Sequence, residues 1–366
     1  MKSFPTRKLL LLLLIGILST AYASDGLQLI HADRNIGEKI NGQPVRIFRG
    51  NVHFRQDTLH MYCDEARFLE NKNKIEFLGN VHIYDGTNTL WAQRIDYYPD
   101  IKQAVCTGNV RIKGKSDSLF AEYLKYSFDT KKATAQNDVF LYNRDENVRI
   151  WGKYGFHNPE KEYSFVKGDA RLVRIDSSGS RADTFTVDAQ RLEYFAKEDY
   201  AVATDSVLIT QNALRSVCDT AIYYNDQEIA WLIHHPYVWY EENRLHGDKI
   251  KAQFDSLVIR KLFIYGEACA ETIVDSAEGR ISKLTAREIQ FDIKDKKPKR
   301  IVAVDNATSI YYLEEEGKDK GVNYATSDTI MIHFTEGKVD SIQIIGGAEG
   351  IFYPAGYKGV KKFEQE

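Results

Sequence analysis

The segment from Gly108 to Ser116 has the residue types of a phosphate-binding loop. Gly114-Lys115-Ser116 follows Gly108, and such a loop brings backbone N–H groups to a phosphate while its lysine neutralises charge. The motif requires four residues between its two glycines, and this chain has five. No helical pattern follows the serine. The sequence therefore does not predict a nucleotide site.

Two adjacent histidines, His234 and His235, are candidate metal ligands. Neighbouring residues on a strand point to opposite faces, so this pair cannot readily chelate one ion. We interpret the two side chains as exposed or packed at a strand edge. No Cys/His cluster has the spacing of a zinc site. We expect no metal and no cofactor.

Acidic residues are abundant, with 52 Asp and Glu in the chain. Two facing carboxylates could cleave a polysaccharide by acid–base catalysis. Most of these residues stand at expected turns or alternate with apolar residues, which predicts a solvated outer face. Nothing in their spacing singles out a pair. We therefore expect no catalytic residues, and an enzyme acting on envelope polysaccharide is the least favoured hypothesis.

The four cysteines are Cys63, Cys106, Cys218 and Cys269. None belongs to a CxxC pair. Cys63 and Cys218 occupy a position of an internal repeat that elsewhere holds alanine, which favours a small buried residue over a structural disulfide. Disulfides are the alternative, because export would place these thiols in an oxidising compartment.

The first 23 residues have the pattern of a secretory signal peptide. A basic start is followed by the apolar stretch Leu9 to Leu18 and by Ala21-Tyr22-Ala23, a small-x-small cleavage site. Cleavage would remove three positive charges and change the formal net charge from −3 to −6. That balance argues against nucleic acid as a partner. We expect a soluble, exported protein.

Four valines, Val52, Val81, Val110 and Val139, recur at intervals of 29 residues. The first three each close a Gly-Asn-Val tripeptide. A fixed period of this size is typical of repeat architectures, in which stacked units bury a shared core. The Gly-Asn-Val segments alternate with period two, so we expect strands without a slip, with Phe77, Gly79 and Val81 on one face.

A second motif lies between the valines, with the form apolar, x, small, x, x, apolar, x, aromatic. Its clearest copies begin at Leu90, Leu119, Val187 and Leu284. In the first copy the step from Ala92 to Ile95 is three residues, which interrupts the alternation of a strand. The slip predicts a bulge or corner beside the small residue. Each unit is then an outgoing and a returning strand, both bent near the middle.

These patterns predict an all-β fold, an elongated repetitive β-jelly roll of stacked bent antiparallel strands with two facing sheets and open edges. The 29-residue period loosens after Val139, and the loop at 176–180 is the expected module boundary. We expect a signal peptide at 1–23, one module at 24–176, a more divergent one at 181–355 and a disordered tail at 356–366.

The combination of a signal peptide, Gly-Asn-Val strands and the slipped return strands resembles the OstA/LptA-like family. Its most specific segments are Thr107-Gly108-Asn109-Val110 and Gly247-Asp248-Lys249-Ile250, and the match runs from Ile30 to about Phe352. The resemblance implies a periplasmic bridge protein of lipopolysaccharide export. The chain is longer than a single-module bridge and lacks the C-terminal barrel sequence of the translocon member. A long bridge, a translocon-associated subunit and a paralogue all remain open.

We expect the protein to bind lipopolysaccharide without catalysis, shielding acyl chains in an apolar trough between the two sheets. The candidate lining residues are Val52, Phe54, Phe77, Val81, Ile83, Ile95, Tyr97, Val110, Ile112 and Leu124. The alternative for each of them is that it packs as ordinary core.

The open sheet edges predict strand addition with other jelly-roll components of the export machinery, or head-to-tail self-association. A structural or adhesive β-rod that binds proteins or glycans is the second hypothesis. A dry, fully packed interior would favour it over a lipid carrier.

Overall fold

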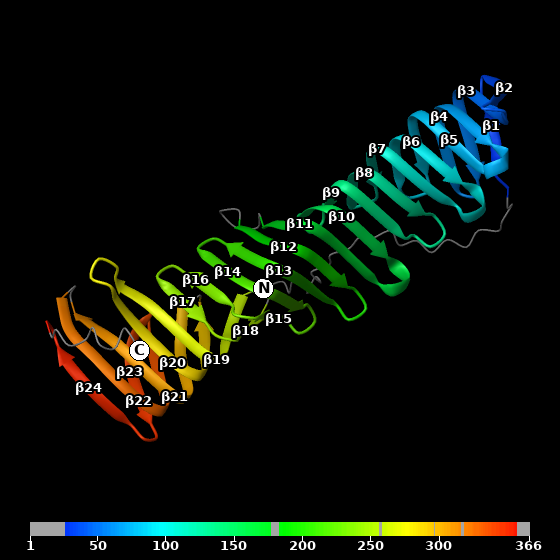
Figure 1. Ribbon diagram of the computed structural model, residues 1–366. Coiled ribbons are helices and arrows are strands. Elements are labelled where there is room, and N and C mark those ends of the chain that lie inside the picture. The colour runs from blue at the N-terminus through cyan, green and yellow to red at the C-terminus, as the bar shows by residue number, and fades with distance from the viewer. Residues whose placement is uncertain (1–25, 177–182, 256–257, 296, 316–317, 357–366) are drawn as a thin grey trace, which may run out of the picture. The chain divides into compact units, whose positions relative to one another are not determined.

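The computed structural model describes residues 26–176, 183–255, 258–295, 297–315 and 318–356 (Figure 1). The signal peptide expected at 1–23, the boundary loop at 177–180 and the tail from 357 lie outside the described residues. Within these ranges the fold is all-β, as the sequence predicts, with three 3₁₀ turns as the only helical elements.

The chain divides into two compact units between Ala201 and Val202. The elements of the first unit are β1 Gln28–His31, β2 Arg34–Ile40, β3 Gln43–Gln56, β4 Leu59–Leu69, η1 Glu70–Lys72, β5 Lys74–Tyr84, β6 Thr89–Tyr98, η2 Pro99–Ile101, β7 Gln103–Lys113, β8 Asp117–Ser127, β9 Ala133–Asn143, β10 Val148–Asn158, η3 Pro159–Lys161, β11 Tyr163–Asp176 and β12 Asp183–Phe195. The division falls inside β13 Tyr200–Gln211.

The elements of the second unit are β14 Leu214–Tyr224, β15 Ile229–Ile233, β16 Tyr237–Tyr240, β17 Asn243–His246, β18 Lys249–Asp255, β19 Val258–Asp275, β20 Arg280–Lys294, β21 Lys297–Glu315, β22 Lys318–Thr335, β23 Lys338–Ile345 and β24 Glu349–Pro354. Together the two sets confirm the expected succession of outgoing and returning strands.

Strands of the first unit pair with their neighbours in sequence. From β2 to β12 each strand is antiparallel to the next, and β1 pairs with the end of β3 that β2 leaves free. β11 and β12 form a hairpin whose register runs to Asp176↔Asp183. Each returning strand therefore lies beside its outgoing partner, which is the arrangement that stacks the repeat.

The second unit follows the same plan with more interruptions. β15 and β16 pair with the two ends of β14, and β17 and β18 pair with the two ends of β19. β19 to β22 pair in sequence, and β22 then pairs with both β23 and β24. Each short pair of strands thus stands where the first unit has one long bent strand.

The bend in each strand is a β-bulge. In β5, Gly79 and Asn80 have φ of 72° and 44°. The register with β6 passes from Leu78↔Arg94 to Val81↔Ala92, so these two residues lie opposite the single residue Gln93. Two residues opposite one bend and twist an antiparallel pair. The slip at Ala92 is therefore a real corner, as the sequence predicts.

The expectation that Gly79 shares one face with Phe77 and Val81 is wrong. Gly79 does not share the inner face with Phe77 and Val81, because it has a left-handed φ at the bulge. Phe77 and Val81 are four residues apart across the bulge, and this even spacing keeps both of them on the inner face. The bend that the sequence predicts near the middle of the outgoing strand is confirmed at this bulge.

The left-handed pair recurs in each outgoing strand. Consecutive positive φ values occur at Gly50-Asn51, Gly108-Asn109, Asn137-Asp138, Gly168-Asp169, Asp205-Ser206, His234-His235, Gly266-Glu267, Asp305-Asn306 and Gly346-Gly347. The adjacent histidines belong to this series, lie at the corner between β15 and β16, and are exposed, which agrees with their interpretation as exposed side chains. The Gly-Asn-Val repeat is thus a repeat of corners.

The corners divide the sheet of the first unit into two parts. We call half-sheet A the part that contains residues 74–78 of β5 and 94–98 of β6. Half-sheet B contains residues 81–84 of β5 and 89–92 of β6. Each of the other strands from β3 to β12 is assigned in the same way, so that the segment on one side of its corner pairs within half-sheet A and the segment on the other side pairs within half-sheet B. Side chains of both parts that face inward form the buried core.

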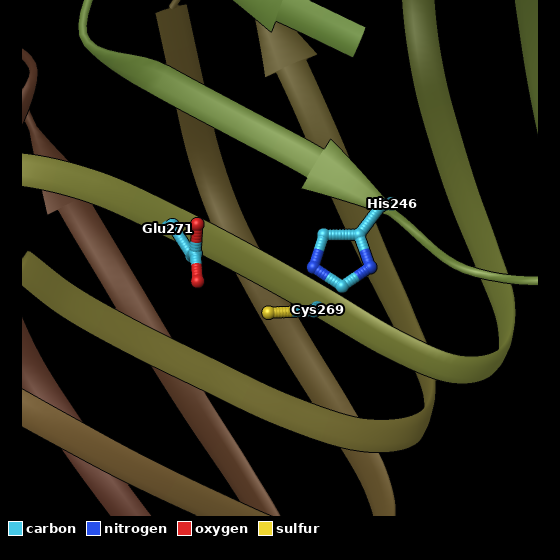
Figure 2. A group of neighbouring side chains, drawn as sticks. All are labelled: His246, Cys269 and Glu271. Atoms are coloured by element: carbon cyan, nitrogen blue, oxygen red, sulfur yellow. The ribbon is translucent and has the colours of Figure 1, made fainter. Parts of the chain in front are cut away.

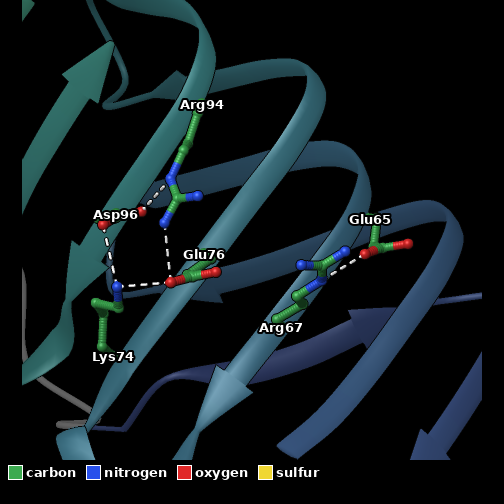
Figure 3. A network of polar contacts seen from close by, with 6 residues as sticks. All are labelled: Glu65, Arg67, Lys74, Glu76, Arg94 and Asp96. Atoms are coloured by element: carbon green, nitrogen blue, oxygen red, sulfur yellow. Dashed lines mark hydrogen bonds and ion pairs between the residues drawn. The ribbon is translucent and has the colours of Figure 1, made fainter. Parts of the chain in front are cut away.

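The outer face of half-sheet A is charged and paired. Lys74 Nζ donates to Glu76 Oε1 (2.7 Å) and Asp96 Oδ2 (3.1 Å), and Arg94 Nε donates to Asp96 Oδ1 (2.8 Å) (Figure 3). Burial alone would lower the pKa of Lys74, but its hydrogen bonds to the two carboxylates raise it overall. These acids are paired with cations on the outer face, and their side chains are only 14 % and 20 % exposed.

Candidate functional site

The ten predicted lining residues are all inward-facing and buried. Their exposed fractions run from 0 to 6 %. Val52, Phe54, Val81, Ile83, Val110 and Ile112 belong to half-sheet B, and Phe77, Ile95, Tyr97 and Leu124 belong to half-sheet A. The structure therefore brings them together as one continuous apolar interior along β3 to β8.

The two half-sheets touch each other through aromatic rings. The rings of Phe54 and Phe77 lie edge to face with centroids 5.7 Å apart, and Phe54 also meets Phe48 at 5.3 Å. Phe54 belongs to half-sheet B, whereas Phe48 and Phe77 belong to half-sheet A. Edge-to-face aromatic pairs at these distances are favourable contacts. The interior is thus held together across the fold as well as along each sheet.

A buried polar contact closes the interior on the side away from the corners. The Tyr97 hydroxyl donates to Oε1 of Gln56 at 2.6 Å, and Gln56 Nε2 donates to the Pro99 carbonyl at 3.3 Å. Gln56 is only 4 % exposed, and burial raises the pKa of Tyr97. A polar pair in this position joins the rim of half-sheet B to the rim of half-sheet A.

A cavity of about 10 Å³ lies next to this contact region, between Ile83, Leu90 and Ile112 on one side and Tyr126 and Phe128 on the other. Its volume corresponds to about one water molecule. The Tyr126 hydroxyl is buried without a hydrogen-bond partner among the described residues, and burial raises its pKa. Residues of both half-sheets line this cavity.

Sequence reasoning missed the polar members of this interior. Gln56 continues the alternation of Val52 and Phe54, so its inward position could have been read from its spacing. His157 and Ser164 are a second case, with His157 Nδ1 2.9 Å from Ser164 Oγ. They come from strands paired in register, but neither lies in a recognised motif. Pairing partners of this kind depend on register, which no local pattern reports.

The cysteines are buried and unpaired, which agrees with their interpretation as small core residues. Burial raises the pKa of the Cys63 thiol to about 12 and that of Cys218 to about 11. Both occupy the small position beside a corner, as expected.

Part of the chain matches a known protein family. Residues 25–184 match the family model of OstA-like proteins. This segment, less than half of the chain, is therefore OstA-like. The OstA-like segment contains all ten inward residues discussed above, and it ends inside β12.

One solved structure similar to this chain is the crystal structure of LptH, the LptA homologous periplasmic component of the conserved lipopolysaccharide transport device from Pseudomonas aeruginosa. It is 18 % identical, covers 38 % of this chain and 95 % of its own, and has a TM-score of 0.30. No curated protein sequence matches the chain. Among the described residues, no helix is long and apolar enough to cross a membrane.

Proposed function

We propose that this OstA-like protein binds lipopolysaccharide in the periplasm and carries it toward the outer membrane without catalysis. The observation that supports this most is the apolar inner face that runs without interruption through β3 to β8. An acyl chain placed there would gain about 0.8 kcal/mol per CH₂ removed from water. Residues 24–176 and 181–355 would form two modules, exported by the cleaved signal peptide.

Lipid entry requires the half-sheets to separate, because the inner side chains contact each other in this structure. The corners join the half-sheets covalently on one side. The opposite side is held by the Tyr97–Gln56 hydrogen bond and ring contacts such as Phe54–Phe77. We propose that the fold opens on that side, where the contacts are non-covalent and a water-sized cavity already lies between the half-sheets.

The strand edges support an assembly role. β1 and β2 pair only with β3 among the described strands, and Leu29, Ile30 and Ile40 on them are exposed. At the other end of the chain, Ile351 and Phe352 of β24 are 50 % and 57 % exposed. Unpaired, apolar edges are templates for strand addition. Other jelly-roll components of lipopolysaccharide export, or a second copy joined head to tail, are the proposed partners.

Site-specific photocrosslinking tests lipid binding. A photoreactive residue replaces Phe77 or Ile95 on the inner face, and matched controls replace the outward neighbours Glu76 or Asp96. We expect lipopolysaccharide adducts from the inner positions only. Equal labelling at inner and outer positions would indicate adventitious binding. No adduct at Phe77 or Ile95 would overturn the proposal.

A chemical lock tests the opening step. In a variant whose four native cysteines are alanine, Gln56→Cys and Tyr97→Cys are joined by a short reagent with two thiol-alkylating groups, which forms a thioether with each cysteine. We expect the linked protein to lose lipopolysaccharide capture, whereas the unlinked double variant keeps it. Capture by the linked protein at the same level would show that lipid does not enter between the half-sheets.

A structural or adhesive β-rod is the second candidate function, and the closed interior is the observation that favours it. Lining residues that are 0–6 % exposed behave as ordinary core in this conformation. The two candidates differ in one measurable respect, since a rod would bind proteins or glycans on its outer face and leave the inner crosslinking positions unlabelled.

A further inference from the structure

Three potential metal ligands meet on the second unit, outside the region proposed to bind lipid. His246 is the last residue of β17, and Cys269 and Glu271 lie on β19 (Figure 2). His246 is directly opposite Cys269 in the register of the two strands. Glu271 follows Cys269 by two residues and so points to the same face. One ligand atom from each residue lies within 4.8 Å of the other two.

The surroundings favour metal binding by each donor. The rings of His246 and Tyr237 are stacked with their centroids 4.6 Å apart. The Cys269 side chain is 2 % exposed. Glu271 is 19 % exposed at its side chain, and its nearest cation is Lys283 at 3.9 Å. The ring orientation is thus fixed by a neighbour, and the carboxylate has only a loose ion pair to give up.

We propose that His246, Cys269 and Glu271 bind a zinc ion at the surface of the second unit. Zinc prefers thiolate, imidazole and carboxylate ligands in tetrahedral geometry. Three protein ligands leave the fourth position to water. Ligand atoms around tetrahedral zinc lie about 3.3–3.7 Å apart. The three ligand atoms here lie within 4.8 Å of one another, so zinc binding would bring the most distant of them closer by about 1 Å.

Binding changes the protonation and pairing of the site. The Cys269 thiol loses its proton to solvent when its sulfur bonds to zinc. Glu271 exchanges its contact with Lys283 for a bond to the ion. No electron transfer or co-reactant is involved.

A bound ion would crosslink two neighbouring strands, β17 and β19. β17 has only four residues, and its register with β19 spans Asn243↔Thr272 to His246↔Cys269. An ion bound by His246 from β17 and by two residues of β19 joins these strands at the end of β17. A ligand that binds only the folded state raises the unfolding midpoint in proportion to the logarithm of its concentration.

Cobalt spectroscopy and thermal unfolding of the mature full-length protein test the site. Co²⁺ added to reduced protein is expected to produce a thiolate-to-cobalt charge-transfer band and the d–d bands of a four-coordinate ion, and Zn²⁺ is expected to abolish both. Cys269→Ser should lose the charge-transfer band. His246→Gln and Glu271→Gln should each weaken metal affinity at least tenfold.

Matched controls stand elsewhere in the same unit. Cys218→Ser removes another buried cysteine, and His235→Gln removes an exposed histidine; neither should alter the cobalt spectrum. Zinc should raise the unfolding midpoint of the wild type and of both controls but not that of Cys269→Ser. If Cys269→Ser keeps the charge-transfer band, or if zinc stabilises all variants equally, the metal is bound adventitiously and the proposal fails. Absence of any band or shift at millimolar metal also overturns it.

Discussion

Tyr97 and Gln56 form the hydrogen bond that joins the two half-sheets at their rim, with 2.6 Å between the Tyr97 hydroxyl and Gln56 Oε1. They are 41 residues apart and lie on β6 and β3, which are not neighbouring strands. The contact therefore depends on the sheet folding back on itself. It is also the contact that must break if the interior opens.

Replacing Tyr97 by phenylalanine removes this bond and leaves the buried Gln56 amide oxygen without its donor. A buried polar group that loses its partner costs about 1–3 kcal/mol. We expect the free energy of unfolding in urea to fall by that amount. Tyr98→Phe, the neighbouring residue on the opposite face, is the control and should change stability by about 0.5 kcal/mol or less. Equal effects of the two changes would assign no special role to the Tyr97–Gln56 bond.

Gly79→Ala tests the corner. Gly79 has φ of 72°, and a Cβ there would lie 2.5 Å from Asp64 Oδ2. Left-handed strain in a non-glycine residue alone costs about 1 kcal/mol or more, and the close approach adds to it. We expect Gly79→Ala to lower the free energy of unfolding by about 2 kcal/mol. Gly37→Ala meets nothing within 4 Å and has no left-handed φ, so it should be almost neutral.

The double variant Asp64→Ala/Gly79→Ala separates the two causes. It removes the side chain that the new Cβ would meet and retains the left-handed φ. Part of the lost stability should return if close approach matters. Asp64 also accepts a 2.8 Å hydrogen bond from Asn80 Nδ2, so the single variant Asp64→Ala must be measured to complete the cycle.

His157 predicts a loss of stability in acid. Burial lowers its pKa to about 4, against 6.5 for an unperturbed histidine. Between these values the unfolded chain binds a proton that the folded chain does not, so stability falls as the pH drops from about 6.5 to about 4. The full loss from this group is on the order of 3 kcal/mol. Unfolding midpoints across this range should fall less steeply in His157→Gln, whereas His31→Gln, an exposed histidine, should follow the wild type.

The thiols should be unreactive in the folded protein. All four cysteines are buried, and burial raises their pKa values, to about 12 for Cys63 and about 11 for Cys218. Because the thiolate is the reactive form, we expect a thiol reagent to label the native metal-free protein slowly. Four thiols per chain should react after denaturation without reductant. Rapid native labelling, or fewer than four thiols, would contradict the buried, unpaired arrangement.

The repeat, the all-β fold and the ten inward-facing residues could be predicted from the residue pattern alone. Alternation of apolar residues is a local property, and a side-chain period of two assigns faces without knowledge of the partner strand. The slip between Ala92 and Ile95 also located the corners on the returning strands, because an odd number of extra residues changes the face of every residue that follows.

The backbone conformation at the corners and the contacts inside the fold became visible in the three-dimensional structure. Phe77 and Val81 keep an even spacing across the bulge of Gly79 and Asn80, so the pattern of inward residues does not show that these two residues have a left-handed backbone. The contacts of Phe54 with Phe77 and of Tyr97 with Gln56 require half-sheets A and B to fold together. His246 meets Cys269 through strand register, across a sequence separation that matches no metal motif. Such contacts depend on strand lengths and on the register between strands, which local residue types do not encode.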